Sequence, residues 1–161
     1  MFVLARAITY ATFFVGFILI ALPERVINAS GVSAPVTAGA WHIAGIIVGG
    51  FGAVLATSCI LTFVFIGRGT PAPFDPPQRL VNRGPYAILR NPMYLGAAIA
   101  MTGAALYYQS LALAGYVAAF LIVTHLFVIG YEEPTLRRMF GREYEDYCRQ
   151  TRRWLPRRAT T

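Results

Sequence analysis

The chain has 161 residues, 57% of them hydrophobic, and a mean hydropathy of +0.55. This composition is too apolar for an ordinary soluble domain and is typical of a membrane protein with several spans. The net charge is +7, and all fourteen basic residues are arginines; Arg6 interrupts the first apolar stretch, and the other thirteen lie between and after the apolar stretches. This placement favours contact with anionic lipid headgroups and argues against a nucleic-acid-binding protein, which needs a basic face on a soluble surface.

Four apolar segments predict an all-helical membrane bundle of about four transmembrane helices. The first covers residues 2–22, and the second covers residues 38–66 with Trp41 as an interfacial anchor. The third and fourth, residues 92–108 and 111–130, are separated by a two-residue turn and should form an antiparallel hairpin. We therefore expect one domain over 1–161, with two spans in 1–67, a cytosolic loop over 68–91, the hairpin over 92–131 and a cytosolic tail helix over 132–161.

Small residues recur every fourth position in the second and third segments. Residues at this spacing let membrane helices approach closely, either across a dimer or inside one bundle, and we favour the bundle. The residues are Gly45, Gly49 and Ala53, then Gly96, Ala100 and Ala104.

The arginines also predict the orientation in the membrane. Four lie between the second and third segments and eight lie in the tail, whereas the loop after the first segment has only Arg25. The positive-inside rule then places both termini and the central loop in the cytoplasm. The polar motifs on either side of the hairpin would therefore lie on the same face of the membrane.

The central loop contains two informative stretches. Residues 70–77, TPAPFDPP, predict a stiff, extended connector that is either a lid or a spacer. Residues 84–96, GPYAILRNPMYLG, begin with a turn at Gly84 and Pro85. Asn91 is then a suitable N-cap for a helix with Pro92 in its first position, and a helix N-terminus can hold an anion.

The tail begins with the acidic pair Glu132 and Glu133, followed by Pro134. The pair either caps the next helix or binds ribose hydroxyls or a cationic ligand. Leu136, Phe140, Tyr144 and Tyr147 then form an apolar stripe typical of an amphipathic helix on a membrane, bent at Gly141. We expect the stripe to serve packing rather than ligand binding.

His125 lies two turns before Glu132 on the same helix face. A histidine inside a membrane helix is a candidate functional residue, although a hydrogen-bonded packing role explains it equally well.

Taken together, GPYAILRNPMYLG, a two-helix hairpin and YEEPTLRRMFGREYEDYC resemble the isoprenylcysteine carboxyl methyltransferase family and the related phospholipid N-methyltransferases. The resemblance covers residues 70–156. It implies an integral membrane enzyme that takes a methyl group from S-adenosylmethionine in a cytosolic pocket, with a lipophilic acceptor entering from the bilayer. Carried over by position, the cofactor-binding residues are Gly84, Pro85, Tyr86, Arg90, Asn91, Pro92, Tyr94, Leu95, Glu132 and Glu133.

One position departs from the family pattern. Eukaryotic members commonly read RHP where this chain reads RNP, and Asn91 cannot titrate. Methyl transfer is an in-line displacement in which alignment and exclusion of water supply much of the acceleration. A carboxylate or thiolate acceptor needs no strong general base, whereas an ammonium acceptor must first lose a proton.

The chain has few candidate bases, namely Glu132, Glu133, His125 and His42, and this favours a carboxylate acceptor. We therefore expect Arg90 and Glu133 to be the catalytic residues, with Arg90 and His125 contacting the acceptor. The alternatives are a phospholipid N-methyltransferase, an NADPH-dependent membrane reductase of the sterol-reductase type, and a non-enzymatic membrane scaffold. No metal-binding spacing is visible.

Overall fold

The computed structural model describes residues 9, 12, 14–32, 39–67 and 79–156. Every regular element within these residues is helical, which confirms the predicted all-helical class. The proline-rich stretch 70–77, predicted to be a stiff connector, lies outside the described residues.

The first helix extends further than the apolar pattern predicts. A π-helical stretch, Val15–Ala21, continues directly into α2, Leu22–Ala29, so the helix passes the predicted end at residue 22. The sequence turns polar after Leu22, yet the helix continues through Pro23 to Ala29. The chain turns only at Gly31, whose φ is +67°.

The second helix agrees closely with its predicted segment. α3, Ala40–Thr62, ends in a π-helical stretch, Phe63–Gly67. The whole helix, Ala40–Gly67, has 28 residues and is long and apolar enough to cross a membrane. At about 1.5 Å per residue it exceeds a hydrocarbon core of about 30 Å, which is consistent with a tilted span.

The hairpin consists of α4, Pro92–Tyr107, and α5, Leu111–Phe127. Ser110 caps α5, because its hydroxyl oxygen accepts a hydrogen bond of 3.3 Å from the N–H of Leu113. α4 has 16 residues, fewer than a usual span needs. Since the first helix lies partly outside the described residues, the four-span arrangement stays a prediction.

The tail has two helices where the sequence predicted one. α5 continues through a π-helical turn, Val128–Glu132, into α6, Glu133–Phe140, and Leu111–Phe140 is the second helix of membrane length in the described part of the chain. Gly141, with φ +50°, then ends α6, and α7, Arg142–Gln150, takes a new direction. The predicted bend at Gly141 is therefore a complete break.

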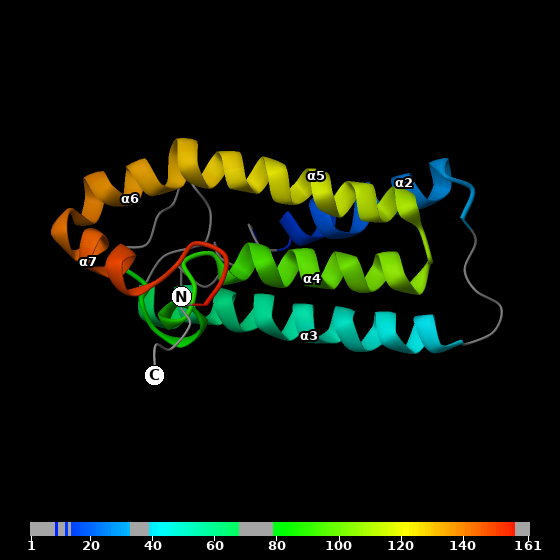
Figure 1. Ribbon diagram of the computed structural model, residues 1–161, viewed down its shortest axis with the longest axis horizontal. Helices are drawn as coiled ribbons and strands as arrows, with labels where there is room; N and C mark the ends of the chain where they lie inside the picture. The colour runs from blue at the N-terminus through cyan, green and yellow to red at the C-terminus, as the bar shows by residue number, and fades with distance from the viewer. Residues whose placement is uncertain (1–8, 10–11, 13, 33–38, 68–78, 157–161) are drawn as a thin grey trace.

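Glycines bring α3 and α4 into close contact along their length (Figure 1). A methyl group added to Gly52 would lie 2.6 Å from the carbonyl oxygen of Gly96, and one added to Gly45 would lie 2.6 Å from that of Gly103. Packing of this kind needs residues without side chains. The small residues thus pack helices of one bundle, as we favoured.

The residues in this contact differ in part from the predicted set. Ala53 is exposed, and Gly52 takes its place on α3; Gly103 makes the corresponding contact on α4, where the sequence suggested Ala104. An α-helix has 3.6 residues per turn, so a strict spacing of four drifts off the contact face and a step of three restores it.

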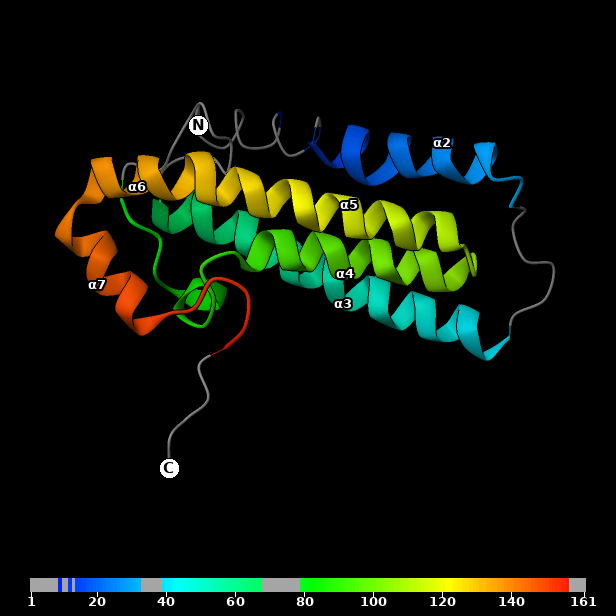
Figure 2. The ribbon, with the colours of Figure 1, turned by 45° about the horizontal axis from the view of Figure 1, so that its top comes forward.

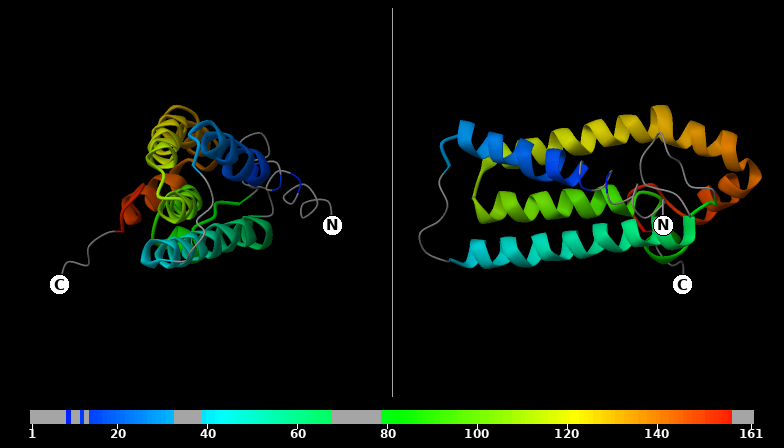
Figure 3. Two further views of the ribbon diagram at one scale, coloured as in Figure 1. Left: turned by 90° about the vertical axis from the view of Figure 1, so that its right-hand side faces the viewer. Right: turned by 180° about the vertical axis from the view of Figure 1, so that it is seen from behind.

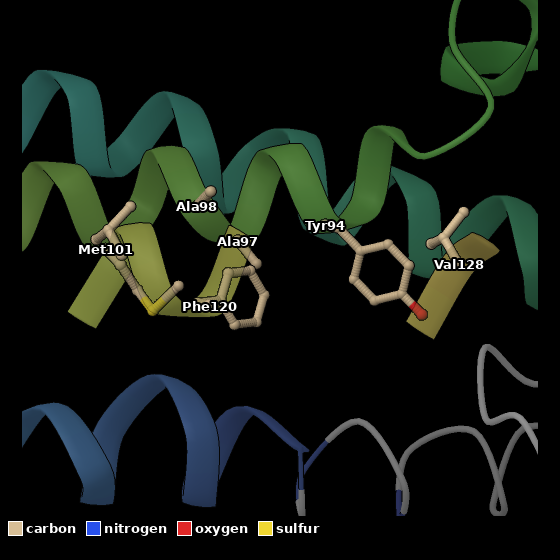
Figure 4. Packing of buried hydrophobic residues seen from close by; sticks show 7 residues of the cluster. Tyr94, Ala97, Ala98, Met101, Phe120 and Val128 are labelled. Carbon is tan, nitrogen blue, oxygen red and sulfur yellow. The ribbon is translucent and has the colours of Figure 1, made fainter. Parts of the chain in front are cut away.

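A hydrophobic core joins α4, α5 and the first helix. Tyr94, Ala97 and Met101 of α4 pack near Phe120 of α5 (Figure 4), and the side chain of Ile18 covers them from the first helix. Figure 2 shows α2 lying beside α5. The polar elements α6, α7 and the segment that follows α7 lie together at the end of the bundle where α4 begins (Figures 1 and 3). The turn between α4 and α5, which contains Ser110, lies at the opposite end.

Candidate active site

The π-helical turn Val128–Glu132 positions two adjacent carboxylates at this end of the bundle. Turns of this type inside helices occur frequently at functional sites. Successive helical residues point about 100° apart, so the two side chains reach different partners. Glu132 faces α4, and Glu133, which begins α6, faces the segment after α7.

Glu133 is the centre of an arginine cluster. Its side chain is almost completely buried, and Arg153 binds it in a bidentate manner, with Nε donating to Oε1 at 2.7 Å and Nη2 donating to Oε2 at 2.9 Å. Nη1 of Arg90 lies 3.5 Å from the same Oε1. The hydrogen bonds to Glu133 raise the pKa of Arg153 above its usual value. Two guanidinium groups thus compensate one buried carboxylate.

Arg90 retains an unused hydrogen-bond donor. Its Nη1 donates to Sγ of Cys148 at 2.7 Å, and its backbone N–H donates to the carbonyl of Arg152 at 2.9 Å. Its Nε is buried and has no hydrogen-bond partner among the described residues. A buried N–H without an acceptor is unfavourable, which makes this atom a candidate contact for a ligand.

Asn91 occupies the N-cap position of α4, as predicted, but its side chain does not cap the helix. Its Nδ2 instead donates to the carbonyl oxygen of Arg153 at 3.3 Å. The backbone of Asn91 (φ −124°, ψ 49°) is also outside the extended conformation usual for an N-cap. The capping prediction is therefore wrong for the side chain, because the amide is engaged by the C-terminal segment.

Tyr94 connects α4 to the acidic pair. Its hydroxyl donates to Oε2 of Glu132 at 3.1 Å, and Figure 4 shows the ring reaching from α4 toward the helix that carries Val128. Glu132 has no ion pair with an arginine in the described part of the chain, so the two carboxylates have different surroundings.

Buried tyrosines surround the charged groups. Tyr86 lies in a short 3₁₀ turn, Gly84–Ala87, where Gly84 has φ +61°. The hydroxyl of Tyr147 donates to the carbonyl of Tyr86 at 2.7 Å. Burial raises the pKa of Tyr86, Tyr144 and Tyr147 above the usual tyrosine range. These hydroxyls therefore stay protonated and serve as donors, not as bases.

Several of these groups line one pocket of about 410 Å³, including its open mouth. Residues from three parts of the chain meet there: the end of the α3 helix, the loop before α4, and the stretch from Glu132 through α7. The lining residues are Phe63, Leu80, Val81, Tyr86, Arg90, Asn91, Glu132, Glu133, Leu136, Tyr144 and Tyr147.

The predicted cofactor-binding residues divide into three groups. The residues that line the pocket are Tyr86, Arg90, Asn91, Glu132 and Glu133. Tyr94 reaches the pocket through its bond to Glu132. The remaining predicted residues, Gly84, Pro85, Pro92 and Leu95, belong to the adjoining turn and helix start and are not among the lining residues.

His125 is not among the lining residues either. Its Nδ1 accepts a hydrogen bond of 2.9 Å from Nε1 of Trp154, and the two rings lie 6.0 Å apart. This geometry agrees with the packing interpretation of His125, whereas its contact with a substrate stays a prediction.

Sequence reasoning missed the importance of the segment after α7. Arg153 was counted only among the eight arginines of the tail, and Trp154 was not singled out, although the two residues follow a helix whose apolar stripe the sequence revealed. That stripe packs on Leu80, and two of its residues, Tyr144 and Tyr147, also line the pocket. A tryptophan beside an arginine just after such a helix was the available signal for a segment that folds back.

The arrangement suits an organic ligand that carries both a positive and a negative group. Within the part of the chain that the structure describes, it offers a guanidinium N–H without a partner, the half-buried carboxylate of Glu132 that no arginine pairs, and several aromatic rings. Among the described residues, no group of His, Cys, Asp and Glu could hold a metal ion.

Comparisons with known proteins point to the same part of the chain. The family model for phospholipid methyltransferase matches residues 40–143. The nickel-cobalt-cadmium resistance protein NccN of Alcaligenes xylosoxydans xylosoxydans is 33% identical over 78 residues, which cover 48% of this chain and 36% of NccN. The chain thus spans about a third of the length of this curated relative. No solved structure matches the chain.

Proposed function

The chain belongs to the phospholipid methyltransferase family, and we propose that it is an S-adenosylmethionine-dependent methyltransferase acting on a lipophilic acceptor at the membrane. The observation that carries the proposal is the convergence of two distant stretches on one pocket. Tyr94 bonds to Glu132, and Arg90 lies 3.5 Å from Glu133, although the hairpin separates them in the chain. Both stretches were singled out from sequence for the same cofactor.

The pocket residues fit the groups of this cofactor. S-adenosylmethionine supplies a methyl group on a positively charged sulfur when bound. The carboxylate of Glu132, which no arginine of the described residues pairs, suits ribose hydroxyls, and the aromatic rings of Tyr86 and Tyr144 suit a cation. The N-terminus of α4 suits the cofactor's carboxylate.

The Nε of Arg90, which has no partner among the residues that the structure describes, supports an acceptor that carries a carboxylate. Arg90 is held between Glu133 and Cys148, so its guanidinium is fixed in orientation, and it would align an acceptor carboxylate by a charge-assisted hydrogen bond. The broad exposed apolar faces of α3 and α5, with Phe51 and Val123 among their residues, are suited to lipid. An isoprenylcysteine-like acid is the acceptor that these features favour.

A phospholipid amine is the second candidate acceptor. An ammonium must lose a proton before it accepts a methyl group, and Glu132 is a carboxylate in the pocket that no arginine within the described ranges neutralises. The two acceptors give different products: a methyl ester, which releases methanol in mild base, and a base-stable methylated amine.

Binding of S-adenosylhomocysteine to the purified protein in detergent tests the cofactor assignment. We expect binding of S-adenosylhomocysteine and S-adenosylmethionine by calorimetry, and no stabilisation by NADPH. Glu133→Gln should weaken binding more than tenfold, because it removes the charge that organises Arg90 and Arg153, whereas Glu143→Gln on the exposed face of α7 should bind like wild type. Stabilisation by NADPH alone would contradict the assignment.

Transfer of labelled methyl groups to membrane lipids and prenylated acids tests the acceptor. We expect base-labile label in the prenylated acids. Label recovered only in base-stable phospholipid headgroups would favour the second candidate.

A further inference from the structure

The segment directly after α7 folds back over the loop that precedes α4. We call residues 151–154 the C-terminal strap. Thr151 begins it, with its N–H and its hydroxyl both donating to the carbonyl of Tyr147. The strap then pairs with the loop, because Arg152 forms a parallel β-bridge with Leu89 and accepts the N–H of Arg90 at 2.9 Å.

The next two residues of the strap reach the hairpin. The carbonyl of Arg153 accepts a hydrogen bond from Asn91, while its side chain binds both oxygens of Glu133. The indole of Trp154 donates to His125 on α5. The strap therefore connects the loop, α5 and α6 at the point where the pocket forms.

Arg153 controls the partners that remain for Arg90. It supplies the two short contacts to Glu133, at 2.7 and 2.9 Å, whereas Arg90 lies at 3.5 Å. Charge-assisted N–H···O bonds prefer about 2.7–2.9 Å, so without Arg153 the carboxylate would draw Arg90 into direct contact. Arg153 thus keeps Glu133 in place and leaves Nε of Arg90 without a partner in the described part of the protein.

We propose that the C-terminal strap, which contacts the lining residues Asn91 and Glu133 from outside the pocket, holds the cofactor pocket in shape, and that Arg153 is its positioning residue, acting on the bound cofactor through Glu133. The proposal rests on the cofactor assignment made above. The proposal implies that the two residues are energetically coupled. Replacing Arg153 should weaken cofactor binding only while Glu133 carries the negative charge that Arg153 holds in position.

A double-mutant cycle on the affinity for S-adenosylhomocysteine tests this coupling. We expect Arg153→Ala to weaken binding about tenfold or more, and Arg153→Ala combined with Glu133→Gln to weaken it no further than the stronger single variant. Added guanidinium should restore part of the affinity of Arg153→Ala. Arg152→Ala is the matched control, because its side chain is exposed and its contacts to the loop use the backbone.

Two outcomes would overturn the proposal while leaving the cofactor assignment intact. One is wild-type affinity in Arg153→Ala. The other is a double variant whose fold-loss of affinity equals the product of the fold-losses of the two single variants, which indicates that Arg153 has a structural role separate from Glu133. Absence of binding to the wild type would instead contradict the cofactor assignment.

Fluorescence provides a readout that needs no cofactor. In a Trp41→Phe background, where Trp154 is the remaining tryptophan, Arg153→Ala should shift the emission of Trp154 to the red as the strap detaches. Unchanged emission in Arg153→Ala would contradict the strap's attachment through Glu133.

Discussion

At the level of single residues, the two adjacent glutamates have different environments. Glu133 is held by two arginines, whereas Glu132 receives a hydrogen bond from a tyrosine in the opposite helix. The π-helical turn that precedes α6 separates these environments. Two adjacent glutamates in a sequence predict neither this turn nor the residues that each glutamate contacts. Which glutamate serves which group of a ligand is therefore a property of the fold.

Tyr94→Phe should destabilise the protein by about 1–3 kcal/mol, because it removes a hydrogen bond to a carboxylate and leaves that carboxylate without its donor. Thermal unfolding in detergent measures the loss. Tyr108→Phe, at the other end of α4, is the control and should unfold like wild type. Equal stability of both variants would show that the bond between Tyr94 and Glu132 contributes little.

Residue types predicted the location of the site better than its contacts. The turn at Gly84, the helix start at Asn91 and the acidic pair were recognisable because each depends on local backbone chemistry. The partners of Asn91 and Glu133 were not, since both bond to Arg153, which lies 62 and 20 positions away in the chain. Such contacts depend on where the chain returns after α7.

At the level of the helices, the contact between α3 and α4 depends on glycine. Gly52→Ala should destabilise the protein by about 1–3 kcal/mol, because the added methyl group would meet the carbonyl oxygen of Gly96 at 2.6 Å. Gly50→Ala on the same helix meets nothing within 4 Å and should be neutral, or stabilising by up to about 1 kcal/mol through helix propensity. Thermal unfolding of the two variants side by side is the measurement. A similar loss in both would mean that the glycines serve helix flexibility and not close packing.

Helix bounds followed the apolar pattern wherever that pattern ended with a structural signal. α4 begins at Pro92, and α5 is capped by Ser110, as the residues indicate. The first helix and α5 both continue past their apolar segments, because polar residues at the end of a helix do not interrupt its backbone hydrogen bonds. The end of an apolar segment marks where contact with lipid ends, and in these two cases this is not the residue at which the helix ends.

At the level of the whole molecule, the chain is organised along one axis. The pocket, α7 and the C-terminal strap lie at one end of the bundle, and the turn between α4 and α5 lies at the other (Figure 1). If Leu111–Phe140 crosses the membrane, these two ends face opposite aqueous compartments. The arginine-rich end should then be cytoplasmic.

Cysteine labelling of intact cells tests this orientation. Leu111→Cys, exposed at the start of α5, should react with a membrane-impermeant maleimide added from outside, whereas Glu145→Cys, exposed on α7, should react only after the membrane is permeabilised. The wild-type protein, with Cys59 buried and Cys148 half-buried, measures the background. The reverse pattern would place the arginine-rich end outside, where the anionic headgroups of the cytoplasmic leaflet would not attract it. Labelling of both variants from outside would mean that Leu111–Phe140 does not separate the two compartments.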